Sequence, residues 1–336
     1  KTPRRCVLHP AMKTRQTSTP RLVEVTCAEG GTVPRKRLKQ KWRLSDTSAQ
    51  EGTIVLITGS NCGIGFEMAM ELSGKGAEVI LACRSRPRAE KARERILERH
   101  PQGIVHFIEL DLADLKSVQR AAAEVVATFP RLDVLINNAG VMIPPRSTTA
   151  DGFELQVGTN HLGHFAFTAH LLPHLEKASK PRIITVSSIA HTVGRLDLAN
   201  MHGKGKRYDK WGQYGRSKLA NLMFALELDR RLKASGSHVV SLASHPGYAN
   251  TSLQRHSLMW RVLNTVALSP ERGAAATVFA ATEPEALAHP YWGPVGPLEA
   301  WGWTGRAKMS RRAKHVDDAA ALWAWSETET GVSFPL

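Results

Sequence analysis

The apolar residues of this chain fall into short continuous runs that alternate with longer segments of mixed polarity. Runs of five or six apolar residues between turn residues are typical of strands buried on both faces of a parallel sheet, whereas an apolar repeat every three to four residues indicates a helix. The pattern predicts strands at 53–58, 78–83, 104–109, 132–136, 182–186 and 238–243. It predicts helices at 64–74, 87–99, 114–128, 152–178, 213–234, 271–282 and 317–327.

This alternation of strand and helix from residue 46 onwards predicts an α/β fold of the Rossmann type. We expect a single domain, residues 46–336, with a doubly wound parallel β-sheet and helices on both faces. Residues 191–212 and 290–306 have no clear period and are predicted loops, and 248–269 is predicted to be a flap. We see no internal repeat.

Residues 1–45 differ in charge from the rest of the chain. They hold twelve Lys and Arg against two Glu, so most of the chain's net charge of +15 lies here. A polar, basic segment without a core-forming period is predicted to be a disordered extension. The alternative is an arm that binds nucleic acid or an anionic surface. The absence of aromatic residues before Trp42 disfavours nucleic acid.

Four tryptophans lie near the C-terminus: Trp301, Trp303, Trp323 and Trp325. We interpret them as packing of the C-terminal part onto the domain, with a ligand cage as the alternative.

Other classes of protein are disfavoured by what the sequence lacks. It contains no run of about 18 apolar residues, so we expect no transmembrane helix. The four cysteines, Cys6, Cys27, Cys62 and Cys83, follow neither a disulfide framework nor a metal-ligand spacing. We therefore expect reduced thiols, no metal and a cytoplasmic protein.

The most informative stretch is the glycine-rich turn Thr58-Gly-Ser-Asn-Cys-Gly-Ile-Gly65, between the first predicted strand and its helix. Glycines there let a pyrophosphate approach backbone N–H groups, and the helix N-terminus favours its negative charge. The spacing is G-x-x-x-G-x-G. The predicted cofactor-binding residues of the turn are Gly59, Ser60, Asn61, Gly63, Ile64 and Gly65.

Small or polar residues also follow the next strands, at the edge where α/β sheets bind ligands. Asp111 could accept a hydrogen bond from an adenine amino group, or it could be a helix N-cap. Asn137-Asn-Ala-Gly140 would let a nucleotide approach the fourth strand, or be only a turn. The cofactor-binding residues predicted from these two segments are Asp111, Leu112, Asn138, Ala139 and Gly140.

The end of the second strand suggests which cofactor is used. An NAD site carries an acid there, but this chain has Cys83 followed by Arg84. A guanidinium suits a 2′-phosphate, so we predict a preference for NADP(H). NAD(H) stays open, because Arg84 could be an ordinary surface cation.

Tyr214 and Lys218 lie four residues apart and so on one face of a predicted helix. A nearby ammonium favours the phenolate, so Lys218 could lower the pKa of Tyr214 toward a working pH. Ser188, at the end of the fifth strand, could orient a substrate carbonyl. Ser187 is the weaker candidate, since adjacent strand residues point to opposite faces. A tyrosine and a lysine at this spacing also occur by chance.

Together these motifs resemble the short-chain dehydrogenase/reductase family over about residues 42–330. Within it the chain is similar to the retinol dehydrogenase and protochlorophyllide reductase-like branch, through Ser60-Asn61, Ala82-Cys-Arg84, Asn160-His-Leu-Gly-His-Phe165 and the wide gap from Ser188 to Tyr214. The resemblance implies that Tyr214 is the general acid/base, Ser188 holds the carbonyl oxygen and Lys218 binds the nicotinamide ribose. It also implies that Asn160 supports a water leading to Lys218, that Asn137 and Gly140 line the cofactor, and that Pro246, Gly247 and Thr251 contact the nicotinamide.

We therefore expect an NADP(H)-dependent oxidoreductase with a Ser-Tyr-Lys-Asn proton relay. Apolar residues near the cleft predict a lipophilic carbonyl or alcohol as substrate, unless they pack against the body. Those residues are Leu253, Leu258, Met259, Trp260 and Val262 in the flap, and Val193, Leu196 and Trp211 in the 191–212 loop. The alternatives are a nucleotide-sensing protein without catalysis and a nucleic-acid-binding module. A homo-oligomer is possible.

Overall fold

We analysed a computed structural model, which describes residues 41–204, 208–248 and 268–336. All of them belong to one compact unit. Within these ranges no helix is long and apolar enough to cross a membrane.

The described strands form one sheet in the order β3-β2-β1-β4-β5-β6-β7-β8. Neighbouring strands run parallel from β3 to β7, and β8 is antiparallel to β7. The chain reverses its winding direction between β1 and β4, which confirms the predicted doubly wound α/β fold. The strands are β1 Ile54–Thr58, β2 Glu78–Cys83, β3 Ile104–Glu109, β4 Val134–Asn137, β5 Arg182–Val186, β6 Val240–Ser244, β7 Tyr291–Pro294 and β8 Thr304–Arg306.

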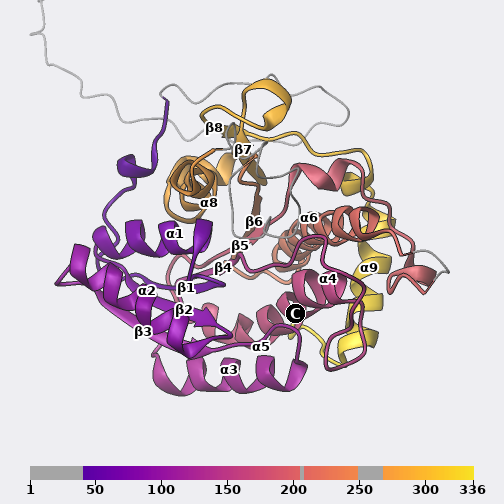
Figure 1. Cartoon of the computed structure of the whole chain (residues 1–336), viewed down its shortest axis with the longest axis horizontal. Coiled ribbons are helices and arrows are strands. Elements are labelled where there is room, and N and C mark those ends of the chain that lie inside the picture. The colour runs from indigo at the N-terminus through magenta and orange to yellow at the C-terminus, as the bar shows by residue number, and fades with distance from the viewer. Residues whose placement is uncertain (1–40, 205–207, 249–267) are drawn as a thin grey trace, which may run out of the picture. The chain divides into compact units, whose positions relative to one another are not determined.

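Helices cover both faces of the sheet (Figure 1). Successive strand residues point to opposite faces, so Val55 and Ile57 join one core with α1, α2 and α8. Ile54 and Leu56 join the other core with α3, α5 and α6. The helices are α1 Gly63–Gly74, α2 Arg86–Arg99, α3 Leu115–Thr128, α4 Leu155–Val157, α5 Gly163–Leu175, α6 Lys210–Ala234, α8 Pro270–Thr282 and α9 Val316–Thr330.

Two sequence predictions about elements are wrong. Residues 290–306, predicted as loop, contain β7 and β8. These short strands carry Gly and Pro and have no readable period, so the pairing of β7 with β6 and of β8 with β7 decides their structure. The helix predicted over 152–178 is interrupted by a π-helical turn, Gly158–Leu162. Of the predicted flap, residues 249–267 lie outside the described residues.

The folded unit begins earlier than the predicted boundary at residue 46. Leu44 is buried, and the ring of Trp42 packs edge-on against Phe279 of α8 with 5.3 Å between centroids. The sequence pattern predicts residues 42–45 as part of a disordered extension, because two apolar residues among many basic ones form no recognisable period.

The C-terminal tryptophans pack largely as the sequence indicated. Trp323 of α9 is buried, and its ring centroid lies 4.5 Å from Phe334 and 5.2 Å from Phe165. Trp303 is partly exposed, with Lys41 and Arg43 over its ring.

Candidate active site

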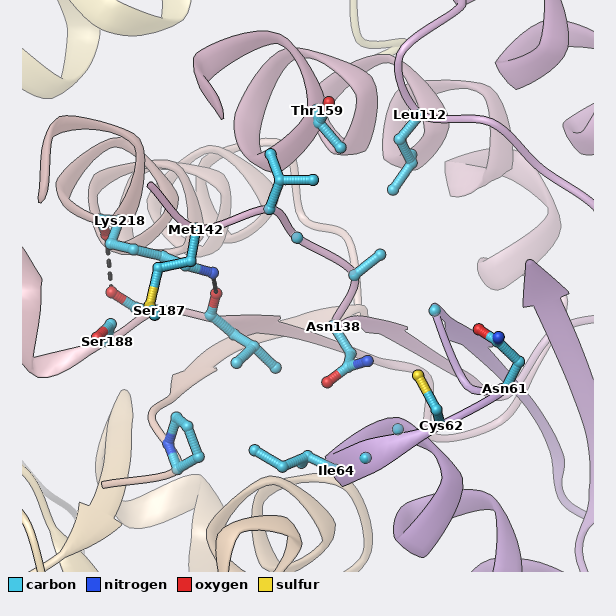
Figure 2. Close-up of a pocket in the computed structure, with 18 of the residues that line it drawn as sticks. Asn61, Cys62, Ile64, Leu112, Asn138, Met142, Thr159, Ser187, Ser188 and Lys218 are labelled. Atoms are coloured by element: carbon cyan, nitrogen blue, oxygen red, sulfur yellow. Dashed lines mark hydrogen bonds between the residues drawn. The ribbon is translucent and has the colours of Figure 1, made fainter. Parts of the chain in front are cut away.

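A cavity of about 410 Å³ opens where the parallel strands end (Figure 2). Its walls come from the turn after β1, from the segments after β2 to β6, and from the N-terminal part of α6. Most of the residues predicted for the site line it: Gly59, Asn61, Gly63, Ile64, Gly65, Arg84, Asp111, Leu112, Asn138, Ala139, Gly140, Ser188, Tyr214, Lys218, Pro246 and Gly247.

The glycine-rich turn leaves no room for a side chain at its last position. A Cβ on Gly65 would lie 2.6 Å from the Gly59 carbonyl oxygen and 2.7 Å from Asn138 Nδ2. A Cβ on Gly59 would lie 2.8 Å from that of Ala139, and Gly59 also has a positive φ of 67°. The turn therefore packs directly on the segment after β4, and backbone rather than side chain faces the cavity there.

Ser60 does not face the cavity. Its side chain is fully buried, and its hydroxyl donates to the Ile57 carbonyl over 2.8 Å. The prediction that Ser60 binds cofactor is therefore wrong for the side chain, which instead closes the turn onto β1. Cys62, which we did not predict, lines the cavity.

Thr58 ties this turn to the segment after β4, a role that sequence reasoning missed. The backbone N–H groups of Asn138 and Ala139 both donate to Thr58 Oγ1 over 2.9 Å. The Thr58 hydroxyl also lies 2.8 Å from Nε2 of His164, and Asn138 Nδ2 donates to the Thr58 carbonyl. Asn137, which the resemblance placed at the cofactor, is buried in β4 and donates to Thr168 instead.

Two cations and an acid stand at the end of the cavity beyond β2 and β3. The Arg84 guanidinium is exposed, and its Nη1 lies 3.7 Å from Asp111 Oδ2. Arg88, which we did not predict, also lines this part. Asp111 is not the N-cap of α3, because Asp114 fills that position by accepting from the Lys116 N–H. Asp111 holds Ala113 N through Oδ1.

The predicted catalytic residues meet at the other end of the cavity. Tyr214 is partly buried and its hydroxyl is hydrogen-bonded to Ser188. Ser188 Oγ accepts from Ala190 N over 3.2 Å. The Ser187 hydroxyl is buried and donates to the Lys218 carbonyl over 2.7 Å, which supports Ser188 as the reactive serine (Figure 2).

The expected effect of Lys218 on Tyr214 is wrong for this structure. Burial raises the pKa of the Tyr214 phenol, and the hydrogen bond with Ser188 opposes that only in part. Lys218 Nζ lies 5.9 Å from the centroid of the Tyr214 ring and donates to the Val186 carbonyl over 3.1 Å. Burial in turn lowers the pKa of Lys218 to about 8. Desolvation is therefore the largest influence on the pKa of both groups.

Asn160 is buried in the π-helical turn, and its side chain holds the neighbouring segment. Its Oδ1 accepts from Val141 N over 2.7 Å, and Nδ2 donates to the Val141 carbonyl and to Ser217 Oγ, each over 3.0 Å. Both amide hydrogens are used. The side chain therefore has no N–H left for the water that the resemblance implies.

The segment after β6 closes the cavity on the side of α8. Gly247 has φ +71°, and a Cβ there would lie 2.6 Å from the Ala300 carbonyl oxygen. Its N–H donates to Nδ1 of the buried His245. Thr251, predicted to contact the nicotinamide, lies outside the described residues. No group of three or more His, Cys, Asp or Glu in the described ranges is placed to hold a metal ion.

Comparison with known proteins agrees with this geometry. The family model described as short chain dehydrogenase matches residues 53–261. Human retinol dehydrogenase 11 is 43% identical over 234 residues, 68% of this chain and 73% of that protein. Mouse retinol dehydrogenase 14 is 38% identical over 307 residues, 85% of this chain and 88% of that protein.

Among solved structures, an uncharacterised protein from Mycobacterium paratuberculosis is 42% identical and superposes with a TM-score of 0.75, covering 88% of this chain and all of that one. The glycine-rich turn, the Ser188, Tyr214 and Lys218 constellation and these relatives lead to one conclusion. The chain is an oxidoreductase of the short-chain dehydrogenase family, in its retinol dehydrogenase-like branch.

Proposed function

We propose that this protein interconverts a lipophilic alcohol and its carbonyl compound with NADP(H) as cofactor. One observation carries the proposal: Ser188, Tyr214 and Lys218 line the same cavity as the glycine-rich turn and Arg84. A proton-transfer group and a phosphate-binding turn in one cavity are what hydride transfer from a dinucleotide requires. A sensor protein that binds the nucleotide without catalysis would have no use for the tyrosine.

The residues present fit a dinucleotide. The turn offers backbone instead of side chains, since a Cβ on Gly65 would lie within 3 Å of three neighbours. The N-terminus of α1 begins at Gly63 and favours negative charge there. Arg84 and Arg88 would bind a 2′-phosphate, and Asp111 would accept a hydrogen bond from the adenine amino group. When bound, the nicotinamide supplies or accepts the hydride.

The chain's own residues handle the proton. Ser188 would donate a hydrogen bond to the substrate oxygen as negative charge grows on it, and Tyr214 would deliver a proton to that oxygen. Lys218 would hold the ribose through its ammonium. Asn160 would hold the backbone of Val141 in place at this end of the cavity. The proton relay would run through Tyr214 and Lys218.

The lipophilic substrate is supported by part of the predicted apolar set. Trp211 lines the cavity together with Met142, Ile189 and Ala190. Val193 is exposed and Leu196 lines a separate cavity, so these two do not contribute here. The names of the retinol dehydrogenases point to an alcohol of the same lipophilic class.

The test is turnover of an aldehyde panel, followed by the loss of NADPH absorbance. We expect a long-chain or isoprenoid aldehyde to be reduced more efficiently than a small polar aldehyde such as glyceraldehyde. Tyr214→Phe should lower turnover by about 10²–10⁴-fold, the usual worth of a general acid, while NADPH still binds. A preference for sugars or hydroxy acids, or near-parental turnover by Tyr214→Phe, would contradict the proposal.

A cytoplasmic location is also our proposal. It is supported by the cysteine pattern of the sequence, which follows neither a disulfide framework nor a metal-ligand spacing. Cell fractionation with an antibody to the protein checks it, and recovery in a secreted or organellar fraction would refute it.

A further inference from the structure

The segment after β4 contains backbone strain at a position that borders the catalytic end of the cavity. Ile143 has φ +48°. A β-branched residue adopts this left-handed conformation only when its surroundings hold it there. Its neighbours Val141 and Met142 line the cavity, as do Ser188 and Lys218 (Figure 2). Whatever fixes Ile143 therefore also fixes the wall that faces the reacting groups.

Two buried side-chain amides hold this segment. Asn160 bonds both the N–H and the carbonyl of Val141, as described above. Gln156 lies in α4, four residues before Asn160, and its Oε1 accepts from Ile143 N over 2.8 Å. The peptide groups on both sides of Met142 are thus fixed by two side chains that do not themselves line the cavity.

The same two amides reach the helix that carries Tyr214. Gln156 Nε2 donates to the Lys210 carbonyl over 2.9 Å and to the Tyr208 hydroxyl over 3.1 Å. Asn160 Nδ2 donates to Ser217 Oγ, which in turn donates to the Tyr214 carbonyl over 2.8 Å. Gln156 and Asn160 therefore connect the wall segment to α6 on either side of Tyr214.

The orientation of the Gln156 amide follows from its partners. Ile143 N can only donate and the Lys210 carbonyl can only accept, so Oε1 must face the first and Nε2 the second. Gln156 is fully buried. Removing its amide would leave the buried Ile143 N–H without its acceptor, and a left-handed Ile143 without the bond that holds it.

We propose that Gln156 is a positioning residue that sets the place of Met142 relative to Tyr214 and thereby helps to select the substrate. This inference rests on the proposed function, which makes the Met142 wall part of the carbonyl-binding site. Gln156 acts through the backbone of Met142 and Ile143 and leaves the glycine-rich turn untouched.

The first measurement needs no substrate. Residue-resolved hydrogen exchange should show faster exchange at the Ile143 amide in Gln156→Met, by about tenfold or more, as expected for one buried hydrogen bond. Gln50→Met is the matched control, because Gln50 is also buried but its side-chain amide bonds only residues 48 and 49. Unchanged exchange at Ile143 in a folded variant would overturn the proposal.

The second measurement separates positioning from general damage. In Gln156→Met the ratio of kcat/KM for a long-chain aldehyde to that for a short aldehyde should change by about tenfold, with NADPH affinity within twofold of the parent. Met142→Ala should shift the same ratio, and the double variant should show little further change, because both act on one wall. Equal losses for both aldehydes, or additive effects, would mean that Gln156 is only structural.

Gln156→Asn provides a milder variant should Gln156→Met fail to fold. It keeps a buried amide but is too short to hold both Ile143 and Lys210, so the same two changes are expected on a smaller scale. If the parent reduces no aldehyde, the proposed function fails, and the exchange at Ile143 alone decides the role of Gln156.

Discussion

Lys218 carries an amine that the fold has removed from water. The side chain is buried, it donates to the Val186 carbonyl, and burial lowers its pKa to about 8. Because an amine prefers to be neutral when it is desolvated, Lys218 is close to releasing its proton at physiological pH. Negative charge entering the cavity would hold the proton in place. Binding of cofactor and the charge of Lys218 are thus expected to be coupled.

We predict that Lys218→Met stabilises the cofactor-free protein at pH 7 while abolishing turnover. The folded pKa of about 8 lies below the unfolded value of 10.5, so the folded state binds fewer protons between these limits. The parent's stability therefore rises with pH from about 8 to 10.5, and the advantage of the variant, up to about 3 kcal/mol at pH 7, should shrink over that window.

Thermal unfolding at pH 7 and pH 10 measures this effect. Lys233→Met is the control, because it replaces a lysine of the same helix that is exposed. A lower melting temperature for Lys218→Met than for the parent at pH 7 would contradict the prediction that the buried ammonium destabilises the cofactor-free protein.

A second prediction at the scale of single residues concerns Arg84. Arg84→Ala should weaken NADPH binding by about five- to tenfold, since an exposed guanidinium forms a charge-assisted but partly screened bond with a 2′-phosphate. NADH affinity should be unchanged.

Fluorescence titration with each nucleotide gives both affinities. Arg120→Ala is a matched control, because Arg120 is equally exposed and also stands 3.7 Å from an aspartate, Asp114. Equal effects of Arg84→Ala on both nucleotides would remove the basis for NADP(H) preference.

The unit of strand β1, glycine-rich turn and helix α1 shows what an element contributes beyond its residues. Its glycines differ in what surrounds them. A Cβ on Gly63 would meet nothing within 4 Å, although φ there is +61°, whereas a Cβ on Gly65 would collide with the Gly59 carbonyl and Asn138. The close approach of the turn to the segment after β4 therefore depends on Gly65.

We predict that Gly65→Ala reduces NADPH affinity and thermal stability more than Gly63→Ala does. Overpacking at such a contact costs about 1–3 kcal/mol, and it would shift the backbone N–H groups that face the cavity. Titration with NADPH and thermal unfolding of the two variants test this. Equal losses would show that backbone conformation rather than the contact dominates.

At the scale of the whole molecule, the helix-covered sheet also recruits the residues just before β1. Trp42 and Leu44 join the core on the side of α8, and Thr47 is buried beside them. The folded domain therefore includes residues from Trp42 onwards, although basic residues flank them in the sequence.

We predict that a chain starting at Lys41 keeps the melting temperature and turnover of the full chain, whereas one starting at Ser48 is less stable. Deleting a buried Leu typically costs about 2–5 kcal/mol, and the second truncation also removes Trp42. Thermal unfolding of both chains checks this. A lower melting temperature for the chain starting at Lys41 would mean that residues 1–40 contribute to the fold.

The sequence by itself was enough for every feature whose signal is local. All six predicted strands and most helices end within one or two residues of the observed bounds, because buried parallel strands are continuous apolar runs and amphipathic helices repeat. The glycine-rich turn, Arg84, Ser188 and the spacing from Tyr214 to Lys218 are also local patterns. They were sufficient to predict many of the residues that line this cavity.

Only the tertiary structure decided what depends on contacts between distant segments. Strand β7 forms because β6 offers it an edge, and β8 forms because β7 does, while Trp42 packs on the core because α8 lies against it. The raised pKa of Tyr214 and the lowered pKa of Lys218 come from desolvation by surrounding elements, which no spacing encodes. The same holds for Gln156, because the hydrogen-bond partners of its amide come from the segment after β4 and from α6, which only the fold brings together.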